Sequence, residues 1–303
     1  MTRLEQEKYE FKCLGEPERP ITEDMCRQAD VSYAAVFSRA EDMAGAALEI
    51  KRLNRDVWVK LPFCVTIEAE CFGADVAFNS LYGVPAVTRF KYEKLTEIEA
   101  LPEIDLQQGR VAEVLRAAEM LHRQGEKIML NIEGPFTVLG QLISVKEIYK
   151  GLYRQPEKLR ELCLGIGRQL AVYGAAAEKH GVDLLSYADP AVAGDLVAPA
   201  IYRDLCGDIT WQVLHGILAN TSRVAVHLCN AASRSFEKAG FCTARHLEFS
   251  PEYQYGQALK EVVENGQERL LGHGCIQRSY CPLCNGGVFT LQLSEGGQAQ
   301  MLF

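Results

Sequence analysis

"RVAVHLCN" occupies residues 223–230 and ends a short apolar run with a histidine and a cysteine. Its length and its β-branched residues are typical of a buried strand. A helical pattern covers residues 200–219 before it, and another lies near residues 233–239 after it. Because parallel strands need a crossover, usually a helix, a buried strand between two helices predicts a parallel sheet.

The same alternation of helix and strand runs along most of the chain. Apolar residues at helical spacing precede "KIMLNIEGP" and "VDLLSYADP", and each of these two runs ends in a turn. We therefore predict an α/β fold, a (β/α)8 TIM-type barrel in regular or modified form, with a short C-terminal β segment. The predicted strands lie within residues 56–63, 127–135, 182–190, 223–230, 242–249 and 269–275.

The domain organisation follows from length and composition. The chain of 303 residues carries no linker rich in Pro, Gly or Ser and no internal repeat. A barrel of this type commonly takes about 250 residues. We predict one domain over residues 1–303, with a lead-in over residues 1–30 and a C-terminal extension over residues 276–303. Within the lead-in, Thr22 followed by two acidic residues predicts the start of a helix.

The composition argues against nucleic-acid binding and against a membrane span. The formal net charge is −8 at pH 7, and no basic stripe stands out in the sequence. No apolar run approaches the roughly 18 residues that a spanning helix needs. Residues 1–10 lack the apolar core of a signal peptide. We expect a cytoplasmic protein whose 11 cysteines stay reduced.

The histidine and the cysteine of "VHLC" are candidate metal ligands. His227 and Cys229 are two residues apart on one predicted strand, so their side chains share a face. A parallel barrel gathers the carboxyl ends of its strands at one mouth, where barrel enzymes place their chemistry. Zinc prefers imidazole and thiolate, and catalytic zinc sites use three protein ligands. We predict zinc held by His227, Cys229 and a third cysteine, for which Cys275 is favoured over Cys281 and Cys284.

Other roles for these residues stay open. A His-x-Cys pair by itself is a weak signal, because buried cysteine often serves as a small apolar side chain and buried histidine is usually hydrogen-bonded. His273, Cys275, Cys281 and Cys284 lie within twelve residues of one another and fit a closed structural zinc site instead. That arrangement leaves the His-x-Cys pair unexplained.

Three carboxylates beside the predicted strand ends are candidate catalytic groups. Glu68 lies after the first predicted strand, Glu133 ends "KIMLNIE", and Asp189 ends "SYAD". A carboxylate at such a position can orient a ligating histidine or accept a proton from a thiol. Each can equally serve as a helix cap or loop acceptor, so a catalytic role depends on their convergence at the mouth.

Longer stretches of the chain resemble a known family. The likeness lies in "GPFTVLGQLI", "YRQPEKLRELC", "GVDLLSYADPAVAGDLVAPAIYRDL" and "VAVHLCN", which are similar to the uroporphyrinogen decarboxylase superfamily. Within it the chain most resembles the methylcobamide:coenzyme M methyltransferases and related corrinoid-protein methyltransferases, whose zinc motif is His-x-Cys with a distant Cys. The resemblance covers roughly residues 57–275.

The resemblance implies a barrel enzyme that moves a methyl group between a corrinoid and an acceptor. It places zinc on His227, Cys229 and Cys275, with Asp189 and Glu133 as groups that position the substrate or support the ligands. The corrinoid, as methylcobalamin, would arrive on a partner corrinoid protein. The acceptor would be a small thiol or a tetrahydrofolate-type compound.

Two alternatives to methyl transfer remain at this point. The decarboxylase proper carries an arginine-rich N-terminal motif, and residues 1–40 hold nothing like it, so porphyrinogen decarboxylation is disfavoured. A lyase related to the decarboxylase, or a non-catalytic zinc-containing partner of a corrinoid protein, would use the same fold. The chain departs from the family in its "CPLC" segment and in the short distance from "HLEFS" to "GHGC".

Overall fold

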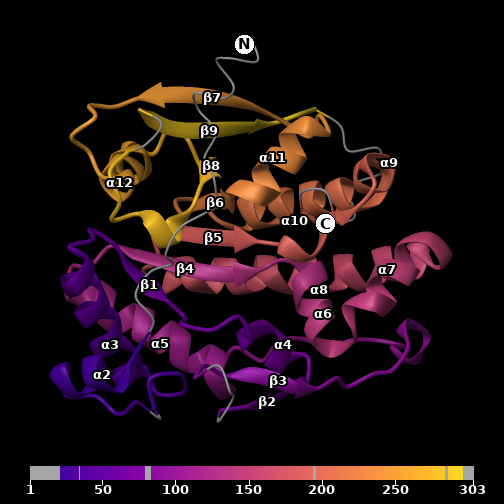
Figure 1. Ribbon diagram of the computed structural model, residues 1–303, viewed down its shortest axis with the longest axis horizontal. Coiled ribbons are helices and arrows are strands. Elements are labelled where there is room, and N and C mark those ends of the chain that lie inside the picture. The colour runs from indigo at the N-terminus through magenta and orange to yellow at the C-terminus, as the bar shows by residue number, and fades with distance from the viewer. Residues whose placement is uncertain (1–20, 34, 79–82, 194–195, 284–285, 296–303) are drawn as a thin grey trace.

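The computed structural model describes residues 21–33, 35–78, 83–193, 196–283 and 286–295. Within these residues the predicted alternation of helix and strand is confirmed (Figure 1). The strands are β1 (Val59–Leu61), β2 (Asp75–Ala77), β3 (Ala86–Arg89), β4 (Ile128–Glu133), β5 (Leu184–Ala188), β6 (Ala225–Cys229), β7 (Cys242–Glu248), β8 (Leu270–Gly274) and β9 (Gly287–Leu293). The α-helices are α2 (Glu23–Gln28), α3 (Ala40–Asn54), α4 (Ile67–Cys71), α5 (Gly109–Arg123), α6 (Pro135–Leu142), α7 (Val145–Arg154), α8 (Pro156–Lys179), α9 (Pro199–Ile201), α10 (Gly207–Asn220), α11 (Asn230–Lys238) and α12 (Tyr255–Asn265). The short helical turns are η1 (Leu95–Glu97), η2 (Pro190–Val192), η4 (Tyr202–Cys206) and η5 (Ile276–Arg278).

The main sheet has seven strands in the order β1-β4-β5-β6-β8-β9-β7. β1, β4, β5, β6 and β8 are parallel to one another, as the crossover helices require. β9 is antiparallel to both of its neighbours, β8 and β7. The predicted C-terminal β segment is therefore an internal strand of the sheet. The molecule has the α/β architecture of the barrel class in a modified form.

β7 occupies a place that its position in the chain does not predict. It lies between β6 and β8 in sequence, yet β6 pairs directly with β8. β7 instead pairs with β9 along its whole length, from Cys242 opposite Leu293 to Glu248 opposite Gly287. Seven backbone-paired positions on β9 hold β7 at the edge of the sheet, so the regular barrel order is lost on this side.

α12 covers the inner face of the curved sheet. Residues of α12 at helical spacing are buried against inner-face residues of β4, β5, β6 and β8. Figure 1 shows α12 beside the strands, between β9 and β1. The opposite face of the sheet packs against α5, α8 and α10 in the larger apolar core. The inner-face cluster includes Met129, Leu184, Ala225 and Leu271 of the strands and Tyr255, Ala258, Leu259 and Val262 of α12.

Buried polar contacts tie β1 to the segments around α12 and β8. Lys60 Nζ lies 3.0 Å from Asp56 Oδ2, and the two side chains are only 5% and 1% exposed. The Ser279 hydroxyl donates a hydrogen bond to the same Asp56 carboxylate. Trp58 Nε1 donates to the Gly256 carbonyl at 2.7 Å. The last two contacts join residues far apart in sequence and connect the first strand to the C-terminal part of the described chain.

Side-chain hydrogen bonds fix the start of α2 and the turn that follows α8. Thr22 accepts a hydrogen bond from the Met25 amide at 3.2 Å, so the predicted start of α2 is confirmed. At the carboxyl end of α8, the Glu178 carboxylate accepts amide hydrogen bonds from Ser222, Arg223 and Val224. These bonds lower the pKa of Glu178 below its usual range. The turn that leads into β6 is therefore held by a charged helix-end residue.

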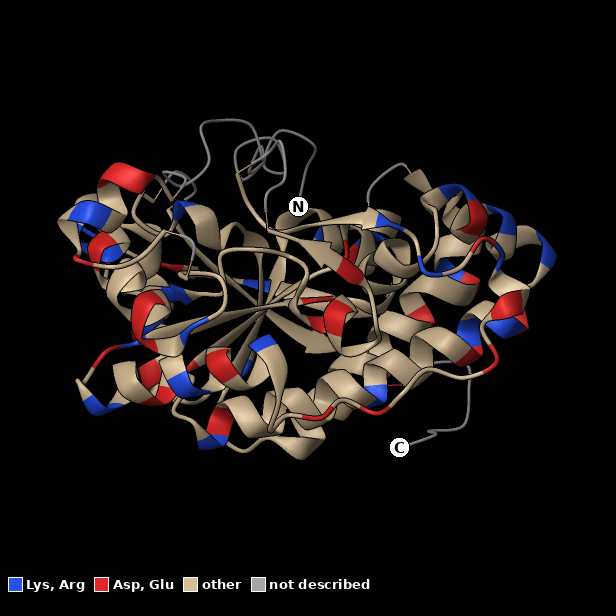
Figure 2. Ribbon diagram, turned by 90° about the horizontal axis from the view of Figure 1, so that it is seen from below, with Lys and Arg blue, Asp and Glu red and all other residues tan. Residues whose placement is uncertain are grey.

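The charges of the described residues are spread over the outer helices. Figure 2 shows basic and acidic segments interspersed along them. Many are paired along one helix, as in Arg123 with Glu119 on α5. No helix among the described residues combines the length and the apolar character that crossing a membrane demands.

Candidate functional site

His227 lies in the middle of β6 with its ring on the inner face of the sheet. Its side chain is completely buried, and Nε2 is 2.8 Å from the Tyr255 hydroxyl of α12. Nδ1 is buried and has no hydrogen-bond partner within the described chain. Burial lowers the pKa of His227 to about 4, so the imidazole is neutral at physiological pH. One ring nitrogen is engaged and the other is available to a further group.

Cys229 and Cys275 lie near one another at the ends of neighbouring strands. Cys229 is the last residue of β6 and pairs in register with Gly274, which directly precedes Cys275. Both cysteines are half-buried and in the free thiol form. Burial raises the pKa of Cys229 to about 11, and the nearby Cys275, Glu133 and Asp189 add to the effect. Without a nearby cation, Cys229 is therefore a protonated thiol at neutral pH.

Tyr255 lies against His227 and close to Cys275. Its hydroxyl contacts His227 Nε2, and the pKa of Tyr255 is raised by burial and then by Cys275. Gly274 leaves the space that this hydroxyl occupies, because a Cβ at position 274 would overlap the Tyr255 ring and oxygen. No sequence motif pointed to Tyr255, since it stands on a helix that follows β7 and reaches β6 only in the folded molecule.

The predicted metal ligands are neighbours, yet they are not arranged as a metal site. In the part of the chain that the structure describes, no three His, Cys, Asp or Glu side chains stand together in a way that could hold a metal ion. The donor types still suit zinc, and the unpartnered Nδ1 of His227 and the adjacent thiols of Cys229 and Cys275 are its candidates. The three residues thus remain predicted ligands.

The alternative structural zinc site is not assembled either among the described residues. His273 lies near the end of β8 with a left-handed backbone, φ 56°, and its Nε2 lies 3.0 Å from Glu237 Oε2. Its Nδ1 lies 3.4 Å from the Ser233 hydroxyl. Cys281 is half-buried, and Cys284 lies outside the described residues. The His273 ring is engaged by α11.

The three predicted catalytic carboxylates come together beside the thiols. Glu68 accepts a hydrogen bond from the Glu133 amide at 3.1 Å. Burial raises the pKa of Glu68 to about 7 and that of Asp189 to about 6. The pKa of Glu133 is raised well above its usual range by burial, with Glu68 and Asp189 adding repulsion. Near neutral pH these three carboxyl groups therefore do not all carry a full negative charge.

Each carboxylate stands in a different local setting. Glu68 belongs to α4 and not to a strand face, whereas Glu133 is the last residue of β4. Asp189 accepts hydrogen bonds from the Phe136 amide, the Thr137 amide and the Thr137 hydroxyl. It therefore caps the start of α6 from the neighbouring strand end. A catalytic role for these residues stays a prediction.

Replacing Glu68 with glutamine should change how stability depends on pH. In the wild type, the folded-state pKa of about 7 exceeds the usual value of 4.5, so the folded chain holds this proton longer than the unfolded chain. Stability is then full below pH 4.5 and falls as pH rises through about 7. The glutamine side chain retains an oxygen that can accept from the Glu133 amide, and the variant should gain about 2–3 kcal/mol relative to wild type between pH 5 and pH 8.

Urea unfolding at several pH values measures this gain. Glu41→Gln, at an exposed position of α3, is the matched control and should follow the wild type at every pH. A Glu68→Gln variant whose stability stays parallel to that of the wild type would show that Glu68 is ionised throughout.

A buried arginine beside these carboxylates was not predicted from the sequence. Arg110 of α5 is only 5% exposed, and its Nε lies 2.7 Å from Glu70 Oε2. Its Nη1 is 3.2 Å from Cys64 Sγ, and Nη2 is 2.8 Å from the Thr66 hydroxyl. Arg110 thus holds the loop between β1 and α4 against α5. Its sequence setting, at the start of an amphipathic helix, is indistinguishable from that of a surface arginine.

Comparisons with known proteins agree with one another. Residues 13–273 match the uroporphyrinogen decarboxylase (URO-D) family. A methylcobamide:CoM methyltransferase MtaA from Methanosarcina barkeri is 27% identical over 256 residues, 82% of this chain and 74% of that protein. MtbA from Methanosarcina acetivorans, another methylcobamide:CoM methyltransferase, is 24% identical over 56% of this chain and 51% of its own. The solved structure of a methyltransferase from Methanosarcina mazei superposes with a TM-score of 0.65 at 21% identity and covers 89% of both chains, which shows a shared fold.

Proposed function

The chain belongs to the uroporphyrinogen decarboxylase family, and we propose that it is a methyltransferase that moves a methyl group between a corrinoid and an acceptor. The observation that carries the proposal is the match to a methylcobamide:CoM methyltransferase over 82% of the chain. The corrinoid arrives on a partner protein, and the acceptor is a small thiol or a tetrahydrofolate-type compound. The polar strand ends, with a free imidazole nitrogen and two adjacent thiols, are a suitable place for such chemistry.

Methyl transfer from the corrinoid to a thiol needs no further oxidant or reductant. The acceptor thiol loses its proton to a base, and its sulfur forms a bond with the methyl carbon. The carbon–cobalt bond breaks with its electron pair on cobalt, so methylcob(III)alamin becomes cob(I)alamin. The nearby Glu133 is a candidate base in its ionised form, which burial and its acidic neighbours disfavour and which a bound cation would favour.

Zinc held by His227, Cys229 and Cys275 is part of this proposal. When bound, zinc makes a thiol a thiolate near neutral pH and leaves a position open for the acceptor. The neutral ring of His227 supports this ligand set, as does the contact of its Nε2 with Tyr255, which leaves Nδ1 as the available nitrogen. The ligands must close around the ion, because the described side chains are not arranged as a metal site.

The test measures methyl transfer and metal content on the same preparation. The purified chain is mixed under anaerobic conditions with methylcobalamin and either coenzyme M, another small thiol or tetrahydrofolate. We expect loss of the methylcobalamin absorbance with one class of acceptor and about one zinc per chain. Zinc without transfer would favour a non-catalytic zinc protein. Absence of both would favour a lyase related to the decarboxylase and would overturn the proposal.

A further inference from the structure

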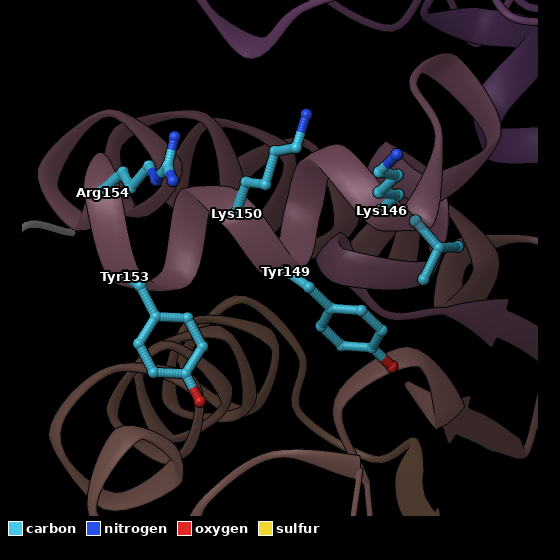
Figure 3. Close-up of a pocket in the computed structure, with 6 residues that line it drawn as sticks. Lys146, Tyr149, Lys150, Tyr153 and Arg154 are labelled. Atoms are coloured by element: carbon cyan, nitrogen blue, oxygen red, sulfur yellow. The ribbon is translucent and has the colours of Figure 1, made fainter.

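Helix α7 carries two parallel stripes of side chains with different chemistry. Residues four apart lie on one side of a helix, so Val145, Tyr149 and Tyr153 form an apolar stripe beside a basic one. Figure 3 shows the two tyrosines on one side of the helix and the basic side chains on the other. These six residues line one surface pocket. The basic stripe consists of Lys146, Lys150 and Arg154.

Most of both stripes is open to solvent, whereas Tyr149 is half-buried and the helix itself is well anchored. Ile148 and Leu152 are buried, and the Tyr149 hydroxyl donates to the Ala191 carbonyl at 3.1 Å. Tyr153, in contrast, is 65% exposed and Val145 is 41% exposed. Tyrosine and arginine are enriched at protein–protein interfaces. An anchored helix with an exposed tyrosine next to an exposed arginine therefore resembles a protein-binding surface.

Two of the three basic side chains of α7 form no ion pair within the described residues. Lys150 forms an ion pair with Glu147 of the same helix. Neither Lys146 nor Arg154 has an ion-pair partner within the described ranges. In a chain of net charge −8, two unpaired cations beside an exposed tyrosine form a local basic site.

Both stripes of α7 lie near the carboxyl ends of the strands that carry the predicted ligands and carboxylates. α7 follows α6, which starts at the carboxyl end of β4, and Tyr149 contacts the segment that follows Asp189. The seven large apolar side chains that are exposed in the described chain all lie in the segments between β1 and β6. They are Val65, Phe78, Phe90, Val145, Tyr153, Val172 and Leu196.

We propose that α7 is a docking surface for an acidic face of the corrinoid-carrying protein, with Tyr153 as the apolar contact and Lys146 and Arg154 as the charged ones. This inference rests on the proposed function. A second copy of the chain is disfavoured as the occupant, because two chains of net charge −8 repel each other. A docked carrier at this position places its corrinoid next to the strand ends.

Charge reversal tests the docking surface. Lys146→Glu combined with Arg154→Glu should raise KM for methylcobalamin bound to a corrinoid-binding protein of the same organism by about tenfold. Transfer from free methylcobalamin should stay within about twofold of wild type. The wild-type KM for the protein-bound form should rise with added salt, and the variant should respond less. Tyr153→Ala should raise the same KM without changing its salt dependence.

The matched control reverses two exposed cations elsewhere. Arg168→Glu with Lys179→Glu makes the same change of charge on α8 and should leave both KM values near those of wild type. Equal KM values for the α7 variant and the wild type with protein-bound methylcobalamin would overturn the docking surface. A shift of oligomeric mass in the α7 variant, measured by light scattering, would assign the stripe to a second copy instead. Failure of the wild type to demethylate free methylcobalamin would count against the proposed function itself.

Discussion

Asp56→Ala is expected to lower the free energy of unfolding by about 3–5 kcal/mol. Asp56 holds Lys60 at 3.0 Å in a buried ion pair and accepts a hydrogen bond from Ser279. Its removal leaves the Lys60 ammonium buried without its counter-charge, which costs far more than the pair contributes. Urea unfolding at pH 7 measures the loss.

The double variant Asp56→Ala with Lys60→Met separates the buried charge from the lost packing. Removing both charges should recover about half or more of the lost stability, because a well-packed apolar side chain can replace a buried ion pair at little cost. A single variant within about 1 kcal/mol of wild type would show that water reaches Lys60. The contact between β1 and the η5 segment would then contribute little to stability.

His227→Ala is expected to reduce methyl transfer from methylcobalamin by at least about 100-fold. The reason is that this variant removes the predicted ligand imidazole, whose Nδ1 has no hydrogen-bond partner within the described chain, from the strand that also carries Cys229. The predicted zinc content should fall in parallel. Anaerobic spectrophotometry measures the rate, and metal analysis of the same sample measures zinc.

Two further variants make the His227 result specific. Tyr255→Phe keeps the histidine but removes the hydroxyl at 2.8 Å from Nε2, and we expect a loss of about tenfold with the fold intact. His215→Ala removes a half-buried histidine that stacks on Trp211 of α10, and it should keep wild-type activity. Full activity of His227→Ala would exclude this residue from the reaction and from metal binding needed for it.

The strand ends combine groups whose ionisation is mutually dependent. The neutral His227 ring, the protonated Cys229 thiol and the three raised carboxyl groups all disfavour charge at this place. A cation that enters the site would reverse this balance, since it stabilises thiolate and carboxylate together. The proposed metal binding should therefore release protons and grow weaker as pH falls.

The order of helices and strands could be predicted from the sequence because its causes are local. Each of the six predicted strands is present, with bounds that lie inside the predicted ranges. An apolar run of four to eight residues between turns is consistent with a buried strand, and its short length argues against a helix. The same local logic placed Thr22 at the start of α2 and put His227 and Cys229 on one strand, His227 in its middle and Cys229 at its end.

The convergence of Glu68, Glu133 and Asp189 followed from the barrel prediction, whereas their individual roles did not. Asp189 was predicted as a catalytic group, and the structure shows that its carboxylate caps α6. Sequence position cannot separate these roles, because both need a carboxylate directly after a strand. The amide groups that it accepts from lie more than 50 residues away.

The sequence by itself determined the α/β class, the strands and the residues offered at their carboxyl ends, because apolar periodicity and turn residues act over a few positions. Only the tertiary structure decided that β9 enters the sheet and moves β7 to its edge. It also decided that α12 covers the inner face and brings Tyr255 to His227. In both cases segments far apart in the sequence compete, β7 and β9 for the sheet edge beside β8 and the helices for the inner apolar face. Which segment wins depends on how well its side chains pack in the folded molecule, and local sequence patterns do not contain that information.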